Sequence, residues 1–204
     1  LSTHVTLNPK DATVRHSFIP RIWATRKVAA LVDQIRQMGA EGLAQDDPRM
    51  KELTEEIVRL STRYGILTEY TAFLAREEVD FSAGMAPIAA PAAENFRRLA
   101  VEKRTGSAGV SQQADYAGKS QALNAQRSNR YASVDGDGQA KETNFDKQVS
   151  NLADRSYFLR KDRWVDGRLL DKETLAPDEE VAFLSERYFE VAGQLAREGR
   201  QAAL

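Results

Sequence analysis

The chain has 204 residues, 42% of them hydrophobic, with 29 basic and 30 acidic side chains and a formal net charge of −1. This composition is typical of globular proteins, and the balanced charge excludes a strong field drawing the whole molecule to nucleic acid or a membrane. The absence of cysteine excludes disulfides and thiolate chemistry. The sequence contains no run of about 18 apolar residues that would predict a transmembrane helix. The start at Leu1, without an initiator methionine or a signal peptide, suggests a fragment or a processed chain.

The first part of the chain predicts a helix pair flanked by strands. Alternating residues over 5–8 predict a short strand, whose partner we expect upstream of this sequence. Apolar residues at helical spacing predict helices over 20–38 and 48–64, the second capped by Asp47. The short connection between them favours an antiparallel pair. The β-branched and aromatic residues over 66–75 predict another strand.

The middle of the chain has a different composition. Residues 84–93 are almost all Ala, Pro, Met and Gly and are interpreted as a linker, and 93–104 predict a short basic helix. Residues 107–150 are rich in Ser, Gln, Asn, Ala, Gly and Asp and offer few large apolar side chains to bury. We expect some helix around 111–126, and loop or disorder in the rest of this segment.

The last part of the chain returns to an ordered pattern. Residues 156–170 predict a β-hairpin that turns near Lys161 and Asp162. Residues 178–197 predict a helix, because apolar residues recur at helical spacing and an acidic trio stands where the positive end of the helix dipole favours it. We expect both elements to pack back onto the helix pair.

Together these elements predict an α+β fold that is mainly helical, with an antiparallel helix pair, short strands, a β-hairpin and a C-terminal helix. The expected division has three parts. Residues 1–80 hold the helix pair with its flanking strands, 81–150 form an Ala/Pro-rich and then polar linker that is partly disordered, and 151–204 hold the hairpin and the last helix.

The sequence gives no reason to assign a catalytic, cofactor-binding or metal-binding residue. The two histidines, His4 and His16, have no metal-ligand spacing, and the nucleophile and phosphate-loop motifs are absent. A turn around Asp135 and Asp137 resembles a calcium loop, but Asn144 stands where such a loop needs a bidentate glutamate. A flexible polar turn is the preferred interpretation there.

Two groups of basic residues leave alternatives open. The basic segment Arg97–Arg130 makes a nucleic-acid or polyanion-binding module an alternative function, although aromatic side chains are sparse around it. Arg21, Arg26 and Lys27 stand near the start of the helix over 20–38, where positive charge opposes the helix dipole. Either buried acceptors from another domain receive them, or they are solvent-exposed at a small cost.

Three segments resemble a known family. These segments are similar in content and order to segments of certain bacterial proteins. The first is His16-Ser17-Phe18-Ile19-Pro20-Arg21-Ile22-Trp23-Ala24-Thr25-Arg26-Lys27-Val28, the second runs from Glu56 to Leu74, and the third is Tyr157-Phe158-Leu159-Arg160-Lys161-Asp162-Arg163-Trp164-Val165-Asp166. Those proteins carry a vault/inter-alpha-trypsin (VIT) domain followed by a von Willebrand factor A (VWA) domain, and the similar segments come after the A domain. Their closing helix is similar to the stretch from Phe183 to Phe189. Glu69 and Ala72 depart from the family pattern, which has proline and serine there.

The resemblance implies a non-catalytic accessory region of a VIT/VWA adhesion-type protein that mediates protein–protein interaction. It implies that the upstream domains of the same polypeptide are its partners, with another protein as an alternative partner, and that the parent protein belongs to the cell envelope or is secreted. The A domain's metal site requires a DxSxS motif, which is absent here. No cofactor is therefore expected in this segment, and a divalent cation is expected only in the upstream A domain.

Overall fold

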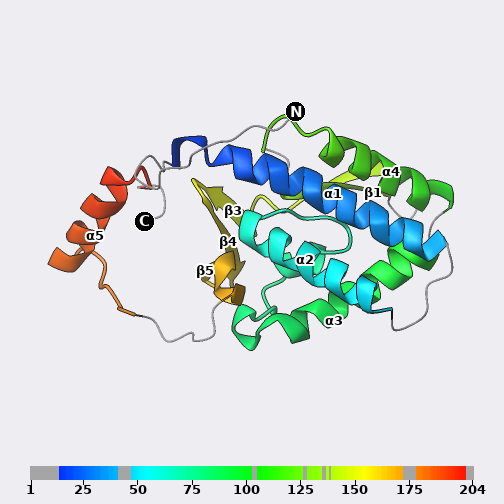
Figure 1. Ribbon diagram of the computed structural model, residues 1–204. Coiled ribbons are helices and arrows are strands. Elements are labelled where there is room, and N and C mark those ends of the chain that lie inside the picture. The colour runs from blue at the N-terminus through cyan, green and yellow to red at the C-terminus, as the bar shows by residue number, and fades with distance from the viewer. Residues whose placement is uncertain are drawn as a thin grey trace, which may run out of the picture.

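The computed structural model describes residues 14–40, 47–102, 105–125, 128–134, 137, 139–171 and 178–200. In these residues the chain is α+β and mainly helical, with two small antiparallel sheets, which confirms the predicted fold class (Figure 1). The strand predicted over 5–8 lies outside the described residues. No helix in the described ranges combines the length and apolar character needed to cross a bilayer.

The helix pair forms as predicted. Helix α1 is Phe18–Ala40, and α2 is Pro48–Tyr64, which runs back along α1 (Figure 1). Asp47 caps α2 by accepting from the backbone N–H of Arg49, and Gly65 ends it in the left-handed conformation at φ +62°. The apolar stripes of both helices pack with later residues into a core formed by Ala24, Val28, Leu31, Val32, Ile35, Ile57, Leu60, Ile66, Tyr70, Phe96 and Ala100.

The prediction of a strand over 66–75 is wrong. The chain forms turns there, followed by a 3-10 helix at Ala72–Ala75. The reason is local, because the hydroxyls of Thr68 and Thr71 each accept from the other residue's backbone N–H, at 3.3 and 3.1 Å. Such side-chain to backbone bonds compete with strand pairing. Leu67 and Leu74 are still fully buried, so the apolar content that suggested a strand serves the core instead.

The linker interpretation of 84–93 is also wrong. Residues Met85–Asn95 form helix α3, with Pro91 inside it, and a π-helical stretch follows at Phe96–Glu102. Alanine is the strongest helix former, and the alanine content outweighs the prolines once Ile88 and Ala92 are buried next to α2. The basic helix predicted over 93–104 corresponds to the end of α3 and this π-helical stretch.

The polar segment is more ordered than its composition predicts. Helix α4 is Gly106–Ser120, which confirms helix in the region of 111–126 but starts earlier and ends sooner. Strands β1, Arg130–Val134, and β2, Ala140–Asn144, then pair antiparallel, where we expected loop or disorder. Both α4 and β1 gain their order from partners, since α4 packs on α1 and β1 packs on α4.

The second sheet contains the predicted hairpin. Strands β3, Val149–Leu152, β4, Arg155–Arg160, and β5, Arg163–Asp166, form an antiparallel sheet in the order β3-β4-β5. The chain turns at Lys161 and Asp162 as predicted, with Lys161 at φ +57°. A 3-10 helix at Gly167–Asp171 then lies against α2. Phe158, Val149 and Leu170 join a second core beneath α2 and α3.

The last helix starts later than predicted. Helix α5 is Glu186–Arg197, capped by Ser185, whose hydroxyl accepts from the backbone N–H of Tyr188 at 3.1 Å. Leu184 has a positive φ of 61°, which stops the helix from extending back towards the acidic trio. No residue of α5 is buried against the described part of the chain, where we expected the helix to pack back onto the helix pair. It lies beside the body, at the end where α1 begins (Figure 1).

Candidate functional site

Arg21 is a buried anchor at the start of α1. Its side chain is 7% exposed, and it donates to the carbonyl oxygens of Tyr64 at 3.2 Å, Ala153 at 3.3 Å and Arg155 at 3.2 Å. Burial lowers the pKa of Arg21, and the carboxylate of Asp154 opposes that effect. The acceptors left open by the sequence are therefore backbone carbonyls of this chain. They join α1 to the end of α2 and to the β3–β4 turn.

The opposite side of the same helical segment is exposed and apolar. Phe18, Ile19 and Trp23 keep 47%, 54% and 54% of their surface accessible, although Ala24 and Val28, on the inner side, are fully buried. Leu123, after α4, is 83% exposed and lies nearby, because Arg26 donates to the preceding carbonyl of Ala122 at 2.9 and 2.7 Å. We call Phe18, Ile19, Trp23 and Leu123 the α1 face.

A cavity of about 500 Å³ opens beside the α1 face. Its lining combines apolar, amide and charged side chains: Phe18, Arg21, Leu123, Asn124, Ala125, Asn129, Asp146 and Asn151. The amide of Asn129 donates to Asp146 at 3.0 Å, and the amide of Asn151 donates to the hydroxyl of Ser128 at 3.0 Å. Exposed apolar side chains beside a polar hollow are typical of surfaces that bind another protein.

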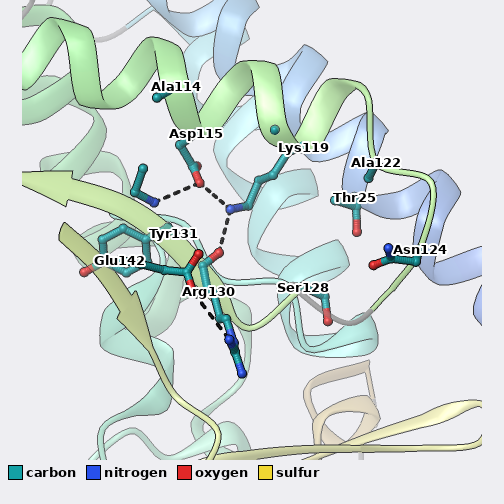
Figure 2. A pocket seen from close by; sticks show the side chains of 12 residues that line it. Thr25, Ala114, Asp115, Lys119, Ala122, Asn124, Ser128, Arg130, Tyr131 and Glu142 are labelled. Atoms are coloured by element: carbon teal, nitrogen blue, oxygen red, sulfur yellow. Dashed lines mark hydrogen bonds and ion pairs between the residues drawn. The ribbon is translucent and has the colours of Figure 1, made fainter. Parts of the chain in front are cut away.

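A second cluster lies on α4, which brings a lysine and an aspartate together. Asp115 and Lys119 are one helical turn apart, and their side chains, 15% and 7% exposed, form an ion pair at 2.5 Å (Figure 2). Lys119 also donates to the carbonyl oxygen of Arg130 at 2.8 Å, and Asp115 accepts from the backbone N–H of Ala132 at 3.3 Å. Burial raises the pKa of Asp115, and Lys119 opposes the rise.

This buried pair lines a second cavity of about 150 Å³, together with Thr25, Asn124, Ser128, Arg130 and Glu142 (Figure 2). Arg130 reaches across the hairpin to Glu142 at 3.4 Å and to Asp146 at 2.6 Å. Both members of the Asp115–Lys119 pair are thus held by the backbone of β1 as well as by each other. The arrangement is what a structural link between α4 and β1 requires, because each charge is compensated and hydrogen-bonded.

Glu69, one of the departures from the family pattern, is next to this cluster. With Asp115 and Lys119 it lines a small hollow between α1 and α4, and burial raises its pKa. The neighbouring Tyr70 is 2% exposed and stacks on Phe96 with ring centroids 4.5 Å apart. Burial also raises the pKa of Tyr70. The two residues belong to the packing of α1 and α4 against the turn after α2.

The basic residues of the segment Arg97–Arg130 are dispersed. Arg97 pairs with Glu94 at 2.7 Å, Arg98 donates to the amide oxygen of Asn95 at 3.2 Å, and Lys119 and Arg130 are paired as described above. Lys103, Arg104 and Arg127 lie outside the described residues. The described members of the segment are bound within the chain, so they lend the nucleic-acid alternative no support, and it stays a prediction.

The other candidates from the sequence are placed as follows. His16 is exposed and contacts Phe18 edge to face, with ring centroids 6.0 Å apart, whereas His4 is outside the described residues. Of the calcium-like turn, residues 135, 136 and 138 lie outside the described residues. Within the described ranges, no group of three or more histidine or carboxylate side chains is placed to hold a metal ion.

Sequence reasoning missed the two most informative features of this region. The i,i+4 spacing of Asp115 and Lys119 was a usable signal, but it stood in a segment interpreted as only partly helical. For Arg21, nothing local predicts burial, because its acceptors are 43 to 134 positions away. The aromatic residues of the three segments that resemble the family also differ in role, since Tyr70 is buried whereas Trp23 and Trp164 are 54% and 49% exposed.

The chain was compared with known proteins, and no match was found. No family model, no curated protein and no solved structure matches the chain. The similarity to VIT/VWA proteins therefore stays a resemblance of short segments, and function has to be argued from the α1 face and its surroundings.

Proposed function

We propose that this chain is a non-catalytic accessory region of a VIT/VWA adhesion-type protein, and that it binds another protein through the α1 face. The observation that carries the proposal is the exposure of Phe18, Ile19 and Trp23 on a segment that resembles the family. Large apolar side chains grouped on one rigid surface are typical of a protein interface, and tryptophan is among the residues enriched at the positions that carry most of the binding energy.

The anchoring of this segment supports the proposal. Arg21 and Ala24 fix the inner side of α1 to the rest of the chain, so Trp23 is presented by a helix that is already ordered. A pre-ordered surface loses little conformational entropy on binding. The resemblance makes the upstream domains of the same polypeptide the first candidate partner, in a parent protein of the cell envelope or secreted type.

The test begins with the coding sequence ahead of Leu1. The proposal expects an A domain with a DxSxS motif there, and an open reading frame without one contradicts the family assignment. That A domain, produced separately, is then titrated with the chain in a calorimeter. Trp23→Ala is expected to weaken binding by roughly tenfold or more.

Trp164→Ala is the matched control, since Trp164 has a similar exposure but lies on β5, outside the α1 face. It is expected to leave the affinity unchanged. Binding that tolerates Trp23→Ala but is lost in Trp164→Ala would move the interface to the second sheet.

A further inference from the structure

The segment 178–197, which we call the C-terminal arm, has an exposed apolar side that no part of the described chain covers. Phe183, Leu184 and Phe189 are 75%, 60% and 59% exposed, and α5 buries none of its residues. The arm is nevertheless held in place at its end, because Arg200 pairs with Asp154 at 2.9 Å. An ordered segment with exposed aromatic side chains is typical of a surface that binds a partner.

The arm and the α1 face have opposite charge. The arm carries five carboxylates and two arginines, and one of these arginines, Arg187, is shared between Glu179 at 2.8 Å and Glu190 at 2.9 Å. Residues 14–32, which include most of the α1 face, carry Arg15, Arg21, Arg26 and Lys27 and no acidic residue. Each surface therefore combines exposed aromatic side chains with a net charge, negative on the arm and positive around the α1 face, and the two are complementary.

Within one copy, the arm does not cover the α1 face. Phe183 and Phe189 on one surface and Trp23 on the other stay exposed, with α5 beside the body rather than on α1 (Figure 1). We propose that the arm of one copy docks on the α1 face of a second copy, so that two copies exchange arms in a reciprocal dimer. The proposal rests on the proposed function only in treating the α1 face as a protein-binding surface.

The exposed apolar area of the two surfaces, aromatic and aliphatic together, is sufficient for such a dimer. Reciprocal exchange brings together Phe18, Trp23, Phe183 and Phe189 of both copies, each about half to three-quarters exposed. An aromatic side chain buries roughly 150–250 Å², so these rings alone remove on the order of 1,000 Å² from water. Specific interfaces begin at about 1,200 Å², and the aliphatic side chains of both surfaces add the remainder. A protein that binds the α1 face has to displace the arm.

The experiment measures mass and tryptophan burial on the full chain. The average molecular mass measured by light scattering is expected to rise with concentration, from 22.8 kDa towards twice that mass. In a Trp164→Phe background Trp23 is the only tryptophan, and its emission is expected to shift to the blue as the dimer forms. The double variant Phe183→Ser/Phe189→Ser, which changes only exposed side chains, is expected to stay monomeric with a solvent-exposed Trp23.

Val110→Ser is the matched control, because Val110 is 72% exposed but lies on α4, outside both surfaces, and this variant is expected to dimerise normally. Lys27→Glu is expected to weaken the dimer, and adding Glu186→Lys is expected to recover part of the affinity. Binding of the upstream A domain by the Phe183→Ser/Phe189→Ser variant tests the proposed function separately, since that variant keeps its α1 face.

Three results would overturn the proposal. The first is a chain that stays monomeric at every concentration with Trp23 exposed. The second is a dimer that persists in the Phe183→Ser/Phe189→Ser variant, because its interface would then lie elsewhere. The third is a monomer whose Trp23 is buried at every concentration and released by that variant, because the arm would then cover its own copy.

Discussion

The guanidinium of Arg21 donates to the carbonyl oxygen of Tyr64, 43 positions later, at the point where α2 ends. The same side chain also reaches the β3–β4 turn through Ala153 and Arg155. One residue of the first turn of α1 thereby joins three elements that are far apart in the sequence. This bond explains how a basic residue can stand near a helix start, because its charge is received by carbonyl oxygens rather than left next to the helix dipole.

Replacing Arg21 tests this link. Arg21→Met keeps the apolar stem but leaves three partly buried carbonyl groups without their donor, so the free energy of unfolding is expected to fall by about 1–3 kcal/mol. Urea denaturation followed by circular dichroism measures the change. Lys27→Met removes an exposed charge from the same helix and is expected to shift stability by less than about 0.5 kcal/mol. Equal losses in the two variants would contradict a special role for Arg21.

The Asp115–Lys119 pair predicts a strong non-additivity. Asp115→Leu alone leaves the ammonium of Lys119 buried without its counter-charge and is expected to destabilise the protein by about 3–5 kcal/mol. Asp115→Leu together with Lys119→Met removes both charges and is expected to recover most of that loss. A double-mutant cycle built from unfolding free energies measures the coupling, and additive effects would show that the pair contributes nothing beyond its separate side chains.

Glu69 predicts a pH dependence of stability. Burial raises its pKa above the ordinary value of 4.5, so the folded protein holds this proton more tightly than the unfolded chain. As pH rises through 4.5, the unfolded chain ionises first, and the folded state loses stability until the pH exceeds the raised pKa. Glu69→Gln is expected to stabilise the protein above the raised pKa and to flatten the fall in unfolding free energy that begins near pH 4.5. An unchanged profile would mean that this carboxyl has no net burial cost.

Two glycines form a matched pair. A Cβ at Gly167 would overlap the backbone carbonyl of Thr62 in α2, whereas one at Gly118 in α4 would meet nothing within 4 Å. Gly167→Ala is therefore expected to lower the free energy of unfolding by about 1–3 kcal/mol, because backbone must shift. Gly118→Ala is expected to raise it by up to about 1 kcal/mol, since alanine is the better helix former. Thermal unfolding of both variants beside the parent chain checks the opposite signs.

The elements predicted well are those whose signals are local. Helix α2 begins and ends at its predicted residues because Asp47, Pro48 and Gly65 act on the backbone beside them. The turn at Lys161 and Asp162 is equally local. The predicted linker and the expected strand over 66–75 failed for the opposite reason. Helix α3 needs its contact with α2, and the turn at Thr68 is stabilised by side-chain bonds that an apolar count does not register.

The candidate site divides in the same way. The motif around Trp23 pointed to α1, but only the folded chain separates the buried Arg21 from the exposed Trp23, two residues apart. Helical periodicity predicted the last helix but not what covers its apolar side, and in the described part of the chain none of its residues is buried. The basic segment was similarly ambiguous, since the partners of Lys119 and Arg130 come from the backbone and from a different strand.

By itself, the sequence determined the fold class, the helix pair with its caps, the hairpin turn and the apolar character of the arm, because periodicity and capping act within a few residues. Tertiary structure alone decided which side of α1 is anchored and which is open, and where the buried charges find their acceptors. Those outcomes depend on backbone groups brought together from distant positions. The carbonyl of Tyr64 becomes an acceptor for Arg21 only after α2 has packed against α1.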